Sequence, residues 1–195
     1  MGPVVVIIGY FVGSFLPAVL VIQYCTGKTP WEIDENPGAA GAWRVGGPFF
    51  GIVTGVFDVL KGIIPVSMAH RLGLDGFWFT AAACAPVIGH NWSIFYRFQG
   101  GRGLSTATGV LLRLAWSEMA PACVVGIIAG LITKWTPMVG IVGFPLGLIL
   151  MLIGSVDRQK VMTALCVMCI SVIRQIPWLV RKVSSAISSR DKAEK

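Results

Sequence analysis

Charged residues are scarce in this chain. Asp, Glu, Lys and Arg make up 13% of its 195 residues, whereas about a quarter of the residues in a soluble domain are charged. Apolar residues make up 55% of the sequence, and the mean hydropathy is +0.76. This composition excludes an ordinary soluble domain and predicts an integral membrane protein. At about 20 residues per span, the chain has room for six or seven membrane helices and no separate soluble domain.

Long apolar runs predict an all-α, polytopic membrane protein with about seven transmembrane helices. We expect a single domain over residues 1–183 and a polar, disordered cytoplasmic tail at 184–195. No charged residue precedes Pro3, and the first apolar run is too long for the core of a signal peptide, so we expect this run to stay attached. The fourth span is short and polar at its start. The predicted spans are 3–24, 47–68, 77–96, 104–116, 119–133, 137–155 and 160–174.

Acidic residues are fewer than basic ones, and the formal net charge is +7. If the N-terminus lies outside and the chain crosses seven times, most Lys and Arg residues fall into the inside loops and the tail. The outside loops then hold only Arg71, Arg158 and Lys160. This bias places the loops that carry Arg44 and Arg102 on the cytoplasmic side. The positive charge therefore indicates topology and attraction to anionic lipids rather than nucleic acid binding.

The five cysteines do not predict a disulfide framework or a metal site. Cys166 and Cys169 have the spacing of a redox or metal pair, but no His or carboxylate is near them in the sequence. A free Cys in an apolar segment behaves as a small hydrophobic residue. We therefore expect helix packing for these residues, with no metal and no cofactor.

A glycine-rich segment before the fourth span carries the strongest chemical signal. It offers a phosphate several backbone N–H groups, a guanidinium and a helix N-terminus. It lacks the spacing of a Walker loop. The alternative is a structural turn whose arginine follows the positive-inside rule. The expected phosphate-binding residues here are Gly100, Gly101, Arg102, Gly103, Ser105 and Thr106.

Three polar residues lie in or next to apolar spans. Asp58 and Lys61 are three residues apart, so they share one helix face, and we expect them to pair with each other. The pair either holds helices together or lines a polar cavity of the site. His90 lies near the inner end of the third span, where it is either a satisfied helix-end residue or a polar group of the site.

The polar segment 28–47 is a second candidate for anion binding. Small residues such as Gly38 let the backbone approach a ligand closely, and Arg44 can reach an anion. Asn36 lies in the same segment. A plain connecting loop is the alternative.

These blocks occur in a recognisable order. The chain has Gly13-Ser14-Phe15-Leu16-Pro17, then Asn36-x-Gly38-Ala39 with Arg44, Asp58-Val-Leu-Lys61-Gly62-x-x-Pro65, Gly89-His90, and Phe98-x-Gly100-Gly101-Arg102-Gly103-x-x-Thr106. From about residue 9 to 112 it resembles the PlsY-type acyl-phosphate:glycerol-3-phosphate acyltransferases, as a divergent member.

The resemblance implies a bacterial inner-membrane enzyme of phospholipid synthesis with cytoplasmic active-site loops. It would transfer a fatty acyl group from acyl phosphate to the 1-hydroxyl of glycerol 3-phosphate and give lysophosphatidate. Its partners would be these two substrates and membrane lipids, with no metal or other cofactor. The family's catalytic positions correspond to Asn36, Arg44 and Arg102, and Asp58, Lys61 and His90 would support the polar cavity.

The chain also departs from the family pattern. Asp34, Glu35 and Gly41 stand where the family has Ser, Gly and Asn, and Arg102 replaces a Lys. Gln175 and Trp178 stand where a His and an Asn help to position glycerol 3-phosphate. Carboxylates beside a dianionic substrate are unfavourable, so we expect weak turnover that improves when positions 34, 35 and 41 are restored.

Two other functions remain open from the sequence. One is a divergent paralogue that uses another acceptor or binds lipid phosphates without turnover. The other is a small membrane transporter, for which internal repeats or paired broken helices would be expected. The sequence has no convincing repeat.

Overall fold

The computed structural model describes residues 1–193, with side chains described up to Ile176 and at Val180. Throughout this part of the chain the regular structure is helical. Two short 3-10 helices, η1 (Pro30–Ile33) and η2 (Ile94–Tyr96), lie in the connections. The α-helices are α1 (Gly2–Ser14), α2 (Pro17–Thr26), α3 (Ala39–Gly46), α4 (Pro48–Arg71), α5 (Gly76–Asn91), α6 (Leu104–Leu114), α7 (Trp116–Thr133), α8 (Met138–Ile153) and α9 (Arg158–Ala193).

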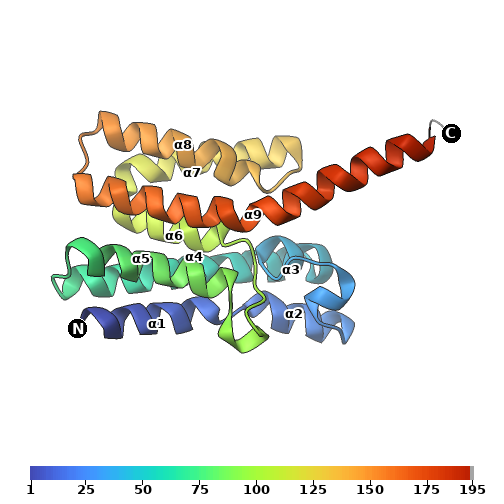
Figure 1. Cartoon of the computed structure of the whole chain (residues 1–195), viewed down its shortest axis with the longest axis horizontal. Coiled ribbons are helices and arrows are strands. Elements are labelled where there is room, and N and C mark those ends of the chain that lie inside the picture. Colours follow the sequence, from blue (N-terminus) through green and yellow to red (C-terminus); the bar gives the residue numbers. More distant parts are fainter. Residues whose placement is uncertain (194–195) are drawn as a thin grey trace.

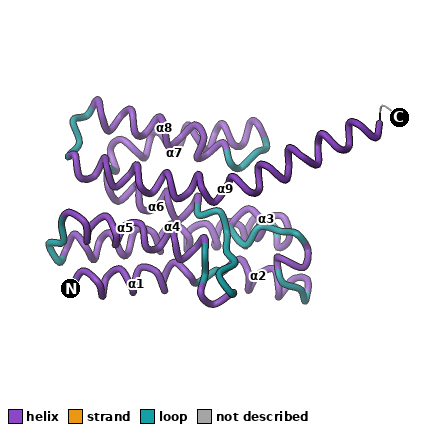
Figure 2. Tube along the Cα trace, viewed as in Figure 1, coloured by secondary structure: helices purple, strands orange, loops and turns teal. Residues whose placement is uncertain are grey.

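The helices run roughly along one direction and form an elongated bundle (Figure 1). The connections α4–α5 and α8–α9 lie at the end that holds the N-terminus, and the segments that carry η1 and the α7–α8 turn lie toward the other end (Figure 2). Within the part of the chain that the structure describes, four segments are long and apolar enough to cross a membrane, namely Gly2–Thr26, Pro48–Arg71, Trp116–Thr133 and Arg158–Ile176. The shorter helices α6 and α8 are also apolar. The all-α membrane fold is thus confirmed, and the count of seven crossings stays a prediction.

The first predicted span is not one continuous helix. The sequence predicts a single span over 3–24, but α1 ends at Ser14 and α2 begins at Pro17. Proline disfavours the helical conformation of the residue before it, and Leu16 accordingly leaves the helical region with φ −114° and ψ 89°. The break frees the Phe15 carbonyl from the helical ladder, so the carbonyl can accept a hydrogen bond from another helix.

Glycines bring α4 and α6 into close backbone contact. A Cβ atom on Gly62 of α4 would overlap the carbonyl oxygen of Thr106, and one on Gly109 of α6 would overlap the carbonyl oxygen of Val59. Small residues at such crossings let membrane helices approach closely. The contact fixes the first turn of α6, which follows the glycine-rich loop, against the helix that carries Asp58 and Lys61.

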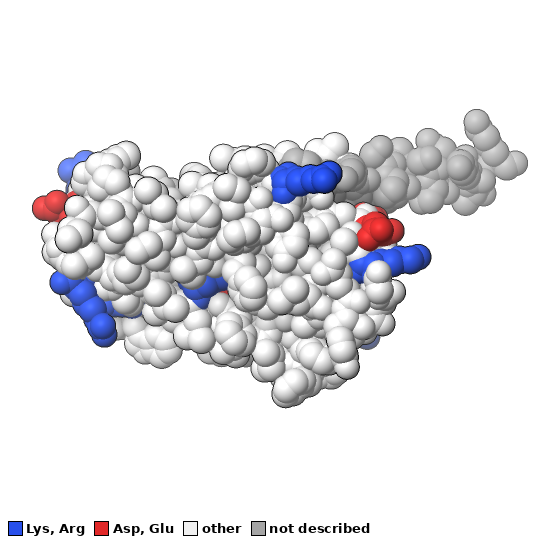
Figure 3. Space-filling view, turned by 90° about the horizontal axis from the view of Figure 1, so that it is seen from below, with Lys and Arg blue, Asp and Glu red and all other residues white. Residues whose placement is uncertain are grey.

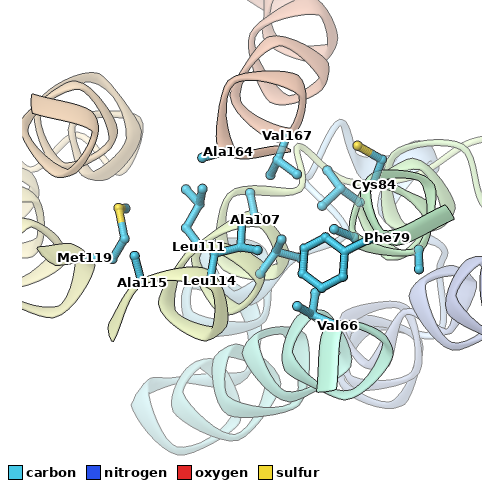
Figure 4. Close-up of a cluster of buried hydrophobic side chains, with 14 of the residues drawn as sticks. Val66, Phe79, Cys84, Ala107, Leu111, Leu114, Ala115, Met119, Ala164 and Val167 are labelled. Carbon is cyan, nitrogen blue, oxygen red and sulfur yellow. The ribbon is translucent and has the colours of Figure 1, made fainter. Parts of the chain in front are cut away.

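Buried apolar side chains from α4, α5, α6 and α9 meet in one cluster that extends to the start of α7 (Figure 4). Val66, Phe79, Leu111 and Val167 contribute from four different helices. The face of the molecule shown in Figure 3 carries few charges between its two ends. Many large apolar side chains are exposed, among them Phe11, Phe57 and Ile149, as expected for a surface that faces lipid.

The backbone of α9 continues as a helix to Ala193, past residue 184, where the sequence predicts a disordered tail. Only the part up to Ile176 is apolar enough to span a membrane, and α9 extends away from the bundle beyond it (Figure 1). The division of the chain into a domain at 1–183 and a tail at 184–195 stays a prediction.

Candidate functional site

The glycine-rich loop folds back over the C-terminal end of α5. The Gly101 N–H donates to the His90 carbonyl oxygen over 3.0 Å. A Cβ atom on Gly100 would overlap that carbonyl, and one on Gly101 would overlap the His90 imidazole. Gly103 has φ +72°, a left-handed conformation that suits glycine, and it is the N-cap of α6. The glycines are therefore needed where the loop contacts α5 and where α6 begins.

Arg174 of α9 also contacts the glycine-rich loop. Its Nε donates to the Gly101 carbonyl oxygen over 3.1 Å, and its Nη2 donates to the Gly100 carbonyl oxygen over 3.0 Å. Its guanidinium also lies 5.7 Å from the centre of the Trp92 ring, within the range of a cation–π contact. Two adjacent carbonyl groups of the loop are therefore oriented toward α9.

Arg44 of α3 forms a two-point ion pair with Glu35. Arg44 Nε donates to Glu35 Oε2 over 2.9 Å, and Arg44 Nη2 donates to Glu35 Oε1 over 2.5 Å. The Asn36 N–H donates to the same carboxylate over 2.6 Å. Burial alone would raise the pKa of Glu35, but these hydrogen bonds and the charges of Arg44 and Arg102 outweigh it and lower the pKa. Glu35 is therefore a carboxylate at neutral pH.

The two arginine-bearing segments lie close to each other. Half-buried Arg102 interacts electrostatically with both Arg44 and Glu35, and burial together with the positive charge of Arg44 lowers the pKa of Arg102 to about 10. The rings of Trp31, in η1, and Tyr96, in η2, also meet with their centroids 5.5 Å apart. The sequence predicts an anion site in each of these segments, and the structure brings both segments together.

A cluster of buried polar side chains connects α1, α4, α5 and α6. Lys61 Nζ lies 2.8 Å from Asp58 Oδ1 and donates to the Phe15 carbonyl oxygen over 2.9 Å. His90 Nδ1 lies 3.6 Å from the same Asp58 oxygen and 3.3 Å from Thr106 Oγ1. Asp58, Lys61, His90 and Thr106 are all buried. The expected Asp58–Lys61 pair is present, and its contacts tie α4 to the α1–α2 break, to α5 and to α6.

The remaining predicted residues occupy the edges of this arrangement. Gly38 is the N-cap of α3, and the Asn36 amide lies near it. Ser105, in the first turn of α6, is half-buried. Asp34 is exposed and has φ 51°, and Gly41 faces the Asn36 carbonyl so closely that a Cβ atom would overlap it.

Of the two C-terminal departures from the family pattern, the structure describes the side chain of Gln175. The Gln175 Nε2 donates to the Ser171 carbonyl oxygen, one turn earlier in α9, over 3.3 Å. The Trp178 side chain lies outside the described residues. The His and Asn that the family places here therefore have no counterpart among the side chains that the structure describes near the loop.

Sequence reasoning missed two contacts at the site: Arg174 contacts the glycine-rich loop, and Phe15 supplies a carbonyl to Lys61. Asn91, the residue after His90, lies against Gly103. Asn91 is buried, and neither polar atom of its amide makes a hydrogen bond with the described part of the chain. An arginine inside an apolar stretch is itself a signal, since such charges usually face the interior of a bundle, and it points to Arg174.

Fold and site together define a polytopic helical membrane protein with a cationic, glycine-rich site between the connections of its helices. A model of the glycerol-3-phosphate acyltransferase family matches residues 3–184. The chain therefore belongs to that family, and the sequence resemblance to it is confirmed.

Curated relatives carry the same description. The glycerol-3-phosphate acyltransferases of Shigella flexneri and of Escherichia coli strain K12 / DH10B are each 38% identical to this chain over 117 residues. The match covers 60% of this chain and 57% of each relative. It therefore spans little more than half the length of these relatives.

Two crystal structures show the same fold. They are of PlsY (YgiH), an integral membrane glycerol 3-phosphate acyltransferase, in a glycerol 3-phosphate form and in a lysophosphatidic acid form. Their TM-scores are 0.83 and 0.82, with 22% sequence identity over 94% of this chain and 92% of each of those chains. At this identity the likeness establishes the fold, and the chemistry has to be argued from the residues of the present chain.

Proposed function

We propose that this protein transfers a fatty acyl group from acyl phosphate to the 1-hydroxyl of glycerol 3-phosphate, which gives lysophosphatidate and inorganic phosphate. The observation that carries the proposal is the meeting of two arginine-bearing segments, with Arg44 and Arg102, beside the first turn of α6. Both substrates carry a phosphate, so the reaction requires two sets of cationic or N–H donor groups close together. Membership of the glycerol-3-phosphate acyltransferase family supports the same reaction.

The reaction itself places modest demands on the protein. The hydroxyl oxygen of glycerol 3-phosphate attacks the acyl carbonyl carbon and forms the ester bond. The bond from that carbon to the phosphate oxygen breaks, phosphate leaves with the bonding electron pair, and the hydroxyl proton passes to phosphate or water. Acyl phosphate is a mixed anhydride with a good leaving group. The site then acts by holding two anions and orienting one hydroxyl.

Each predicted residue has a place in this proposal. Arg102, the backbone N–H groups around Gly100 and Gly103, and the first turn of α6 with Ser105 bind one phosphate. The Gly101 N–H and the buried Thr106 hydroxyl contact His90 instead, so these two predicted residues position the loop and α6. Arg44, with Asn36 and Gly38, binds the other. Asp58, Lys61 and His90 are positioning residues, because their contacts fix α4, α5 and α6 against each other beneath the loops.

We further propose that the protein lies in the bacterial inner membrane with these loops in the cytoplasm. The apolar exposed surface supports a membrane location. The excess of Lys and Arg in the loops at the site supports the cytoplasmic side. Glycerol 3-phosphate is a charged, water-soluble acceptor, so it would reach the site from that compartment.

A second function is favoured by one observation. The Glu35 carboxylate already accepts hydrogen bonds from Arg44. The alternative is therefore a paralogue that takes an acceptor other than glycerol 3-phosphate, or that binds lipid phosphates without turnover. It shares the fold and differs only in the ligand at Arg44.

The test is an acyl-transfer assay on purified protein in lipid nanodiscs. Palmitoyl phosphate is the donor, and glycerol 3-phosphate, dihydroxyacetone phosphate and glycerol are offered as acceptors, with chromatography of the lipid product and measurement of released phosphate. We expect lysophosphatidate from glycerol 3-phosphate. Arg102→Ala should lower phosphate affinity more than tenfold, the loss typical of a charge-assisted hydrogen bond. Product from another acceptor alone would establish the paralogue.

The matched control is Arg97→Ala, since Arg97 is an exposed arginine of the same connection. It should leave acyl transfer unchanged. If both alanine variants keep the parent's turnover, the glycine-rich loop is not part of the site. If no acceptor is acylated by the folded parent, the proposed transfer reaction is wrong.

A further inference from the structure

Glu35 occupies the edge of Arg44 that a phosphate would use. The Nε and Nη2 of Arg44 donate to different oxygens of one carboxylate, over 2.9 and 2.5 Å. A guanidinium binds phosphate in the same two-point geometry. An anionic ligand that approaches this edge must therefore displace the Glu35 carboxylate or share Arg44 with it.

The Glu35 carboxylate is held in this position from two sides. The Asn36 N–H donates to it over 2.6 Å, and its side chain is only 17% exposed, compared with 51% for Arg44. Asp34, which has a left-handed backbone conformation, comes directly before Glu35, and the Glu35 N–H donates to the Pro30 carbonyl oxygen over 2.7 Å. The negative charge is thus a built part of the site rather than a mobile surface group.

The net charge of the residues at the site affects anions of different charge to different extents. Arg44, Arg102 and Glu35 interact electrostatically with one another, and their formal charges sum to one positive unit. Without the Glu35 charge the same group would carry two. A dianion gains more than a monoanion from that second positive charge, because the Coulomb energy scales with the product of the charges. The half-buried setting of Arg102 strengthens the effect relative to open water.

We infer that Glu35 is a specificity-determining residue that lowers the affinity of the site for dianionic phosphomonoesters more than its affinity for monoanionic phosphodiesters. This rests on the proposed function in one respect, namely that Arg44 binds the phosphate of the acceptor. The ligand class whose affinity Glu35 lowers least is a glycerol phosphodiester with a free hydroxyl. The class it disfavours includes glycerol 3-phosphate itself, whose phosphate is largely dianionic above its second pKa of about 6.

The experiment compares the affinities of two ligands that differ by one charge. Glycerol 3-phosphate and its methyl ester, which is a monoanionic phosphodiester, are titrated by calorimetry into the full-length protein in nanodiscs at about pH 8, above the second phosphate pKa. In Glu35→Gln we expect the affinity for glycerol 3-phosphate to rise by about tenfold, the effect of one charge-assisted hydrogen bond. The affinity for the methyl ester should rise by less than about threefold.

Two further variants separate this effect from general charge and from loss of structure. Glu32→Gln is the matched control, because Glu32 lies in the same connection and accepts hydrogen bonds from Thr29 instead of an arginine. It should change neither affinity. A glutamine amide oxygen could still accept a hydrogen bond from Arg44. Glu35→Ala therefore provides a second neutral variant, for which we expect the same rise in affinity for glycerol 3-phosphate.

A double-mutant cycle tests whether Glu35 acts through Arg44. In an Arg44→Ala background, Glu35→Gln should no longer raise the affinity for glycerol 3-phosphate. The inference is overturned if the rise persists there, if Glu32→Gln gives the same rise, if both ligands respond equally, or if the neutral variants bind glycerol 3-phosphate more weakly than the parent.

The binding measurement is independent of turnover, so the two proposals can fail separately. Tighter, charge-selective binding in Glu35→Gln without acyl transfer would support Glu35 as the specificity residue and refute the transfer reaction. Acyl transfer with identical affinities in parent and Glu35→Gln would support the reaction and refute the role of Glu35. No binding of either ligand by any folded variant would overturn the role of Glu35 directly.

Discussion

Arg174 and Gly101 lie 73 residues apart in the chain and are joined by a hydrogen bond of 3.1 Å from the guanidinium Nε to the glycine carbonyl oxygen. A second bond, of 3.0 Å, reaches the neighbouring carbonyl of Gly100. With both carbonyl groups held toward α9, the loop presents other faces of its backbone to a ligand. Arg174 is thus a positioning residue for the loop that carries Arg102.

The first prediction follows from this contact. Arg174→Ala removes both hydrogen bonds and the cation–π contact with Trp92, so the loop loses its fixed backbone orientation. We expect binding of glycerol 3-phosphate or acyl phosphate to weaken by about tenfold or more, since each of the two lost hydrogen bonds to a charged group contributes roughly 1.5–3 kcal/mol. Calorimetry on the purified protein measures this.

Arg174→Lys distinguishes positioning from charge in the same assay. A lysine keeps the positive charge but cannot form the two-point contact, so it should recover only a small part of the lost affinity. Full recovery by lysine would show that the charge alone matters. Parent-like affinity in the alanine variant would show that the loop does not depend on α9.

The second prediction concerns the crossing of α4 and α6. A Cβ atom on Gly62 would overlap the backbone of Thr106, and backbone cannot move aside as a flexible side chain can. Gly62→Ala should therefore lower the free energy of unfolding by about 1–3 kcal/mol, the usual cost of overpacking, and should also lower turnover because Thr106 lies in the first turn of α6. Denaturant titration in detergent micelles measures the stability.

Gly55→Ala is the matched control on the same helix. The nearest atom to its added Cβ is the Cβ of Ala39, at 3.5 Å, which is an ordinary contact. Alanine is favoured over glycine inside a helix by roughly 0.5–1 kcal/mol, so this variant should be as stable as the parent or slightly more stable. Equal destabilisation by the two substitutions would contradict the close crossing at Gly62.

The third prediction decides the role of the Asp58–Lys61 pair. Asp58→Asn leaves a buried ammonium without its counter-ion, and breaking such a pair costs about 3–5 kcal/mol. The double variant Asp58→Leu/Lys61→Met removes both charges and should recover most of that stability. Chemical denaturation followed by circular dichroism measures all three proteins.

Turnover of the double variant separates the two interpretations of the pair. Retained acyl transfer is expected if the pair only fixes the helices. A stable but inactive double variant would instead place Asp58 or Lys61 in contact with substrate. Asp75→Asn, at an exposed turn, serves as the control for loss of a carboxylate.

Local features of the fold could be predicted from the sequence. The expected span 47–68 corresponds to α4 at Pro48–Arg71, and the expected helix start at residue 104 is the first residue of α6. Apolar runs and the glycine-rich segments between them are patterns of residues adjacent in the sequence, so they can be recognised without knowing how the helices pack. The break before Pro17 was also signalled locally, but the continuous apolar run on both sides of it obscured the signal.

The site depended on contacts that the sequence does not encode locally. The Arg44–Glu35 pair joins residues nine positions apart in different elements, and the Arg174 contact requires α9 to pack beside the loop. Gly41 illustrates the difference. Comparison with the family pattern treats it as a lost Asn, whereas in the structure a side chain there would overlap the Asn36 carbonyl. The contact argues against restoring Asn at position 41 without a change in the adjoining backbone.

The last prediction tests the orientation of the bundle. Asp75 precedes α5 and Gln99 follows it, and both side chains are exposed. In a chain whose five native cysteines are replaced by alanine, Gln99→Cys should react with a membrane-impermeant maleimide only in inverted membrane vesicles, and Asp75→Cys only in intact spheroplasts. The physical reason is the excess of Lys and Arg in the connections on the Gln99 side, which favours their retention in the cytoplasm. The reverse pattern would overturn the orientation and place the site away from cytosolic glycerol 3-phosphate, while labelling of both cysteines from one side would show that α5 does not cross the membrane.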